Sequence, residues 1–205
     1  MSSEGVKQST ATRLWFGPAF AQLHPLLQEV HTQGAVLRGP VRVFCGRGLA
    51  GVLGRHFAKR LGVPLGAAAT AAGGEALHLE VRITHTAEHL VWTRRFTNVA
   101  GQVSEVESLF APVGHHPDGY WIETTGRMRF KLAVDVLAGA WHWRVLGVSV
   151  AGFALPLALL PRSHAFKQVE MDEGGTAYRF SVGFALPIVG SLFSYEGVLR
   201  PSASA

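Results

Sequence analysis

From Leu77 onward, apolar and polar residues alternate along most of the chain, and this period of two limits the possible folds more than any other feature. The first two runs are LHLEVRIT (77–84) and LVWTRRF (90–96). The later runs are QVSEVESLF (102–110), YWIETTGRMRFKLAVDVLAG (120–139), WHWRVLGVSV (141–150), AFKQVEMD (165–172), TAYRFSVGFA (176–185) and LFSYEGVL (192–199). Alternation of this kind predicts half-buried strands. Seven or eight such strands with no long helix between them predict an antiparallel sheet that curls.

The residues before Leu77 predict helices around one further strand. One apolar helical face is formed by Phe16, Phe20, Leu23, Leu27 and Val30, and a second by Leu49, Val52, Leu53, Phe57 and Leu61. Pro25 divides the first helix, because proline is best tolerated where a helix begins. The segment AVLRGPVRVFC (35–45) between them is strand-like.

We therefore expect an α+β fold, with a curved, largely antiparallel β-sheet or partial barrel and two N-terminal helices packed on it. A chain of 205 residues fits one domain. We place this single domain at 13–201, between a flexible tail at 1–12 and a second tail at 202–205.

Composition limits the class of protein, its cellular location and its expected partners. Hydrophobic residues make up 48% and charged residues 16% of the chain, which excludes a disordered protein. One cysteine and the absence of a secretory signal favour a cytoplasmic location. The net charge of +5 comes without a basic run or a recognition motif, so no nucleic acid is expected as a partner.

The longest apolar stretch, 147–161, has fifteen residues and includes two prolines. A membrane-spanning helix needs about twenty residues, so we expect no transmembrane segment. Whether this stretch belongs to the core or forms a contact surface stays open.

Two short motifs suggest cofactor chemistry. GRGLAG (46–51) matches a dinucleotide-binding pattern, but the expected second parallel strand with its acidic residue is replaced by an alanine-rich loop. HTAEH (85–89) matches a zinc-peptidase pattern, but it lies where two strands meet rather than on a helix. We therefore expect no cofactor and no metal.

The pentapeptide GFALP occurs twice, at 152–156 and at 183–187, each time after an alternating strand. Proline stops strand pairing because it has no N–H to donate. Bulky side chains near both strand ends predict either an apolar lining for a ligand or a filled core. The candidate ligand-binding residues are Phe153, Leu155, Phe184, Leu186, Tyr195 and Glu196.

The order of motifs resembles a bacterial family, the domain of unknown function 4166. The resemblance is carried by LHPLLQEVH, RGPVRVFCGRGLAGVLGRHFAKRLGVP, VWTRRF, LGVSVAGFALPLALLP and FSVGFALPIVGSLFSYEGVL, and it extends from Arg13 to Pro201. Members of this family often follow a saccharopine-dehydrogenase-like NAD(P)-binding domain or are attached to small membrane proteins. The resemblance implies an oxidoreductase or a membrane protein as partner, but no activity.

We expect the protein to be a non-catalytic module that binds an apolar or amphipathic small molecule or docks on a partner protein. One alternative is an enzyme acting on an apolar substrate, with Glu196 beside Tyr195 as the carboxylate of its pocket. Another is an accessory domain to an NAD(P)-dependent oxidoreductase.

Overall fold

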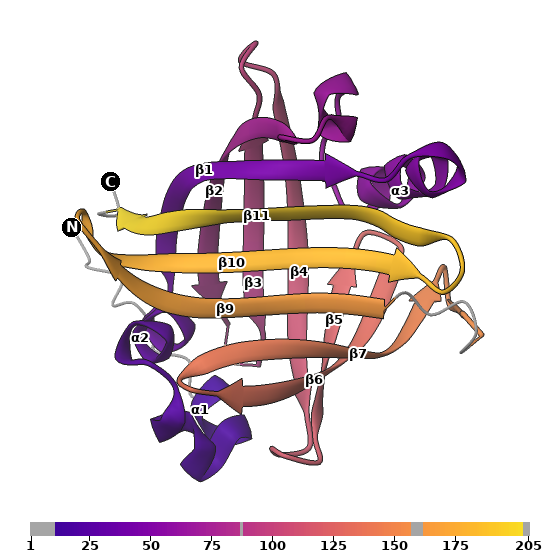
Figure 1. Ribbon diagram of the computed structural model, residues 1–205. Helices are drawn as coiled ribbons and strands as arrows, with labels where there is room; N and C mark the ends of the chain where they lie inside the picture. Colours follow the sequence, from indigo (N-terminus) through magenta and orange to yellow (C-terminus); the bar gives the residue numbers. More distant parts are fainter. Residues whose placement is uncertain (1–10, 87, 157–161, 203–205) are drawn as a thin grey trace, which may run out of the picture.

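The computed structural model describes residues 11–86, 88–156 and 162–202. In this part of the chain the strands form one antiparallel sheet that closes on itself as a barrel (Figure 1). The sheet has eleven strands, and the two-residue strand β8 (Phe153–Ala154) is attached to β7 alone, outside the ring.

The bounds of the elements follow the sequence patterns closely. The helical elements are α1 (Ala11–Phe16), the 3₁₀ helix η1 (Gly17–Gln22), α2 (Pro25–Gln33), α3 (Gly48–Arg60) and the 3₁₀ helix η2 (Ala67–Thr70). The ring strands are β1 (Ala35–Cys45), β2 (Glu75–His85), β3 (Leu90–Thr97), β4 (Val103–Val113), β5 (Tyr120–Thr125), β6 (Met128–Leu137), β7 (Ala140–Val150), β9 (Arg162–Asp172), β10 (Gly175–Leu186) and β11 (Gly190–Ser202).

Closure of the ring corrects the expectation of a partial barrel. Neighbours along the chain pair from β1 to β7, β7 pairs with β9, and β11 returns to β1. A large twisted sheet with open edges would leave rows of N–H and C=O groups without partners, and closure removes these edges. The segment 120–139 forms two strands, because Gly126 adopts a φ of +55° in a tight turn.

Because consecutive ring strands run in opposite directions, their connections fall alternately at two ends of the barrel. The α2 end holds residues 11–34, 86, 88–89, 114–119, 138–139 and 173–174. The α3 end holds residues 46–74, 98–102, 126–127, 151–156 and 187–189. Residues 157–161 of the apolar 147–161 stretch, and residues 1–10 and 203–205 of the expected tails, lie outside the described residues.

The helices pack at these two ends. α2 begins at Pro25, as predicted, and the buried Leu27 and Val30 face the barrel. Phe16 meets Trp141 edge to face, with 4.8 Å between the ring centroids. α3 lies against the start of β11 at the other end.

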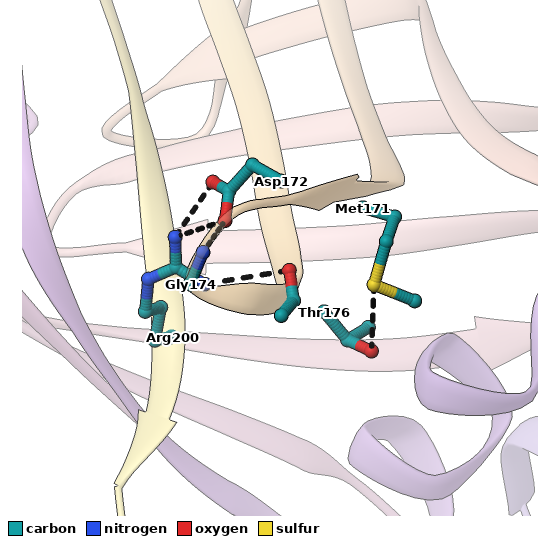
Figure 2. A network of polar contacts seen from close by, with 6 residues as sticks. Met171, Asp172, Gly174, Thr176 and Arg200 are labelled. Atoms are coloured by element: carbon teal, nitrogen blue, oxygen red, sulfur yellow. Dashed lines mark hydrogen bonds and ion pairs between the residues drawn. The ribbon is translucent and has the colours of Figure 1, made fainter.

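An exposed polar network closes the β9–β10 turn (Figure 2). Asp172 accepts hydrogen bonds from Nη2 of Arg200 on β11 at 2.5 and 2.6 Å, and from the backbone N–H of Gly174 at 2.8 Å. The Arg200 bonds, followed by the Gly174 bond, hold the pKa of Asp172 below its ordinary value. This network orders a turn at the surface and is separate from the barrel interior.

Candidate functional site

The barrel interior contains a cavity of about 90 Å³, which is room for several water molecules. Its walls are mainly aliphatic and aromatic, because the inward positions of the alternating strands are the apolar ones. The apolar lining includes Leu37, Leu79, Val81, Trp92, Phe110, Phe130, Leu132, Trp143, Phe180, Phe184 and Leu199.

Arg94 on β3 connects most of the polar groups inside the barrel. Its guanidinium donates to the Tyr195 hydroxyl at 3.2 Å and to the Ser108 hydroxyl, and its Nη2 lies 3.6 Å from Oε1 of Glu123. Thr125 donates to the same carboxylate oxygen at 3.2 Å and lies 2.5 Å from Oγ of Ser108. Hydrogen bonds of this kind offset the cost of removing the two charges from water.

Tyr195 on β11 keeps its proton in this setting. Burial raises the pKa of Tyr195, and the neighbouring Arg94 opposes that shift only in part. The hydroxyl accepts from Arg94 and still has its own O–H to donate. Tyr195, a lining residue of the cavity, therefore keeps an O–H that can donate one hydrogen bond.

Lys167 on β9 lies inside a cage of indole rings. Its Nζ is 3.7 Å from the ring centroid of Trp92, 4.5 Å from that of Trp141 and 5.1 Å from that of Trp143. The residue is only 4% exposed, and its Nζ has no hydrogen-bond partner among the described residues. Burial lowers the pKa of Lys167 well below its ordinary value, although Glu123 opposes the shift.

His31 on α2 covers this cage from the α2 end. Its ring stacks on Trp92 with 5.8 Å between centroids and lies 4.6 Å from the ring of Trp141. Neither ring nitrogen has a hydrogen-bond partner in the described part of the chain. Burial, then the charge of Lys167, lowers the pKa of His31 well below its ordinary value, so the imidazole is neutral at neutral pH.

The charges around the cavity do not balance when every group is ionised. Arg94 and Lys167 are potential cations, whereas Glu123 is the carboxylate in the lining. A buried charge without a counter-ion is costly, so burial disfavours the protonated form of Lys167. The lining of the cavity is thus mainly apolar and aromatic, with two basic side chains and one carboxylate among the described residues.

Comparison with known families gives one match. The sequence profile of the Domain of unknown function (DUF4166) matches residues 23–199. The chain belongs to this family. The comparisons with curated proteins and with solved structures found no match. The region matched to DUF4166 runs from the residues just before α2 to Leu199 in β11, so it includes the strands that carry Arg94, Glu123, Lys167 and Tyr195.

The six residues singled out in the sequence take different places in the DUF4166 barrel. Phe184 and Tyr195 line the cavity. Leu155 and Leu186 are half-buried and pack against the core. Phe153 is 80% exposed at the β7–β8 turn, and Glu196 is exposed on the outer wall, with its Oε2 3.4 Å from Oγ of Ser181.

Sequence reasoning missed the charged residues of the cavity. Their signal was nevertheless visible, because Arg94 falls in phase with the apolar Leu90, Trp92 and Phe96 of its strand. Lys167 likewise falls in phase with Ala165 on β9. A charged residue on the apolar phase of a strand marks a buried polar group.

The two cofactor-like motifs form connections at the barrel ends. GRGLAG is the turn from β1 into α3, and both neighbours of β1 run antiparallel to it, unlike the parallel strands of a dinucleotide-binding unit. In HTAEH, the backbone N–H of Thr86 donates to the carbonyl of His89 at 2.9 Å, so the described residues of this motif form a turn rather than a helix. Residues 11–86, 88–156 and 162–202 contain no cluster of three potential metal ligands. None of their helices has the length and apolar character required to cross a bilayer.

Proposed function

We propose that this DUF4166 barrel binds a small apolar molecule that ends in a carboxylate. The observation that supports this most directly is Lys167, a lining residue of the cavity whose buried Nζ has no hydrogen-bond partner among the described residues. A carboxylate beside it would accept that hydrogen bond and supply the missing negative charge.

The surrounding side chains fit such a ligand. The hydroxyl of Tyr195 offers an O–H to the second carboxylate oxygen, and the guanidinium of Arg94 adds a fixed positive charge. The apolar remainder of the ligand would contact the aliphatic and aromatic walls, Phe184 among them. Pockets for small molecules commonly combine apolar walls with a few polar groups of this kind.

The proposal is for binding without catalysis. The carboxylate that faces the cavity is Glu123, which is held by Arg94 and Thr125. Glu196, the candidate from the sequence, lies on the outer wall, away from this lining.

Isothermal titration with octanoate and 1-octanol tests the proposal, because the two share a chain and differ in the head group. We expect octanoate to bind at least about tenfold more tightly than 1-octanol. Replacing Lys167 with Met should remove this preference. Because binding a carboxylate favours the protonated lysine, titration of the unchanged protein near about pH 8 in buffers of different ionisation enthalpy should show net proton uptake.

The matched control is Lys131→Met. Lys131 also sits over an aromatic ring, 3.9 Å from the centroid of Tyr120, but its side chain lies on the outer wall. This variant should bind octanoate like the unchanged protein. Equal affinity for octanoate and octanol, or no heat from octanoate at millimolar concentration, would contradict the proposal.

A further inference from the structure

The α3 end of the barrel exposes large apolar side chains. Leu49 and Val52 on α3 are 66% and 64% exposed, and Leu53 beside them is also exposed. Phe153 in β8, directly after the β7–β8 turn, and Ile188 in the β10–β11 turn are exposed at the same end. In soluble proteins, apolar groups gathered in this way mark contact surfaces.

These side chains belong to neighbouring segments. Val52 and Leu53 follow Leu49 by three and four residues, so both are neighbours of Leu49 on the surface of α3. α3 is tied to the start of β11, where the N–H of Gly46 donates to the carbonyl of Leu192 at 2.8 Å. Figure 1 shows α3, the β10–β11 turn and the β7–β8 turn on one side of the barrel.

Charge separates the two ends of the molecule. The described connections at the α3 end contain five basic residues and no acidic one; these are Arg47, Arg55, Lys59, Arg60 and Arg127. The described residues at the α2 end contain one basic and four acidic residues; these are Arg13, Glu29, Glu88, Asp118 and Glu173. The α3 end is therefore both apolar and positively charged.

Among the described residues, acidic side chains at the strand ends next to the α3 end have partners of their own and do not pair with the basic residues of α3. Glu75, at the start of β2, accepts a hydrogen bond from the N–H of Gly66 at 2.6 Å and is half-buried. Glu105, near the start of β4, lies opposite Arg95 in the β3–β4 ladder. Arg55, Lys59 and Arg60 are all exposed on α3.

We propose that the α3 end binds the surface of an anionic phospholipid bilayer. The apolar side chains of α3 and of the two turns insert among the headgroups, and the basic residues of α3 face the lipid phosphates. Amphipathic helices with basic flanks bind membrane surfaces in this manner, through buried apolar area together with attraction to anionic lipids. This surface is separate from the interior cavity, so the inference does not depend on the proposed ligand.

Co-sedimentation of the full chain with vesicles tests the inference. One set of vesicles is phosphatidylcholine alone, and the other contains about a third phosphatidylglycerol. We expect at least about tenfold stronger binding to the anionic vesicles, reduced by added salt. The double variant Leu49→Gln/Val52→Gln should weaken binding about tenfold, and Arg55→Gln/Lys59→Gln should weaken it and reduce its dependence on salt.

Matched control variants lie away from the α3 end. Leu14 on α1 and Met171 near the β9–β10 turn are exposed apolar residues, so Leu14→Gln/Met171→Gln controls for hydrophobicity. Arg13→Gln/Arg82→Gln controls for net charge, because Arg82 is exposed near the α2 end of β2. Circular dichroism verifies that each variant is folded.

Three results would overturn the inference. The first is no sedimentation with anionic vesicles at low salt, which is also the result expected if the surface binds an acidic protein instead. The second is equal binding to both kinds of vesicle. The third is an equal loss of binding in the control variants.

Discussion

Lys167 lies where a protonated amine is poorly solvated, and its surroundings compensate only in part. Three indole rings stabilise a cation over their faces. They do not replace the hydrogen bonds that water gives, and burial accordingly lowers the pKa of Lys167 well below its ordinary value of 10.5. The unfolded chain then binds a proton that the folded chain lacks over the pH range between the two values. Stability consequently rises with pH across this range and falls as the pH is lowered.

We therefore expect Lys167→Met to stabilise the free protein by about 1 to 4 kcal/mol at neutral pH, as is common when a buried charged group is replaced by an apolar one. The gain should shrink as the pH rises toward 10.5, because the unfolded lysine then loses its proton too. Urea unfolding at about pH 7 and about pH 9.5 measures both effects. Lys131→Met should change stability by less than about 0.5 kcal/mol. Destabilisation by Lys167→Met would show that the cage stabilises the lysine more than burial disfavours it.

At the scale of elements, the contact between α3 and β11 depends on a glycine. A Cβ atom at Gly54 would lie 2.1 Å from the carbonyl oxygen of Leu192, so only glycine permits this close approach. Phe57, one turn along, then reaches Phe184 and Phe193, with 5.1 and 5.9 Å between ring centroids. The position of α3 thus connects the surface of the α3 end to a wall of the cavity.

The substitution Gly54→Ala has two opposing effects on the stability of the protein. Alanine favours a helix over glycine by about 1 kcal/mol, whereas the clash with Leu192 would push α3 away from β11 at a cost of about 1 to 3 kcal/mol or more. We expect net destabilisation in thermal and urea unfolding. Val52→Ala, on the exposed face of the same helix, should stay within about 0.5 kcal/mol. A more stable Gly54→Ala variant would mean that the contact relaxes easily.

At the scale of the whole molecule, the ring is weakest between β7 and β9. Their ladder has three pairs, from Trp141 opposite Lys167 to Trp143 opposite Ala165, whereas β9 and β10 pair at eleven positions. Val145 and Ser163, beyond the last pair, are half-buried and line the cavity. Separation of these two strands is therefore the motion that opens the interior with the fewest broken hydrogen bonds.

Hydrogen exchange should reveal this weak point. We expect peptides covering 144–150 and 162–164 to exchange at least about tenfold faster than peptides from the middle of β10 and β11, because most residues of these segments pair on one edge only, with β6 or β10, whereas β10 and β11 are paired on both edges. Mass spectrometry of the exchanged peptides measures the difference. Uniform protection around the ring would contradict this description of the barrel.

Local patterns in the sequence determined the antiparallel strands and the start of α2 at Pro25, because side-chain alternation and the missing proline N–H act within a few residues. Tertiary structure alone decided that the sheet closes, because closure depends on hydrogen bonds between strands distant in the chain. The two copies of GFALP also take different places: Phe153 is exposed on the short strand β8 outside the ring, whereas Phe184 is 9% exposed and lines the cavity. Arg94 gives a similar example. The alternation of apolar residues in β3 indicates that Arg94 points inward, but only closure of the ring brings the hydroxyl of Tyr195, 101 residues away, within hydrogen-bond distance of the Arg94 guanidinium.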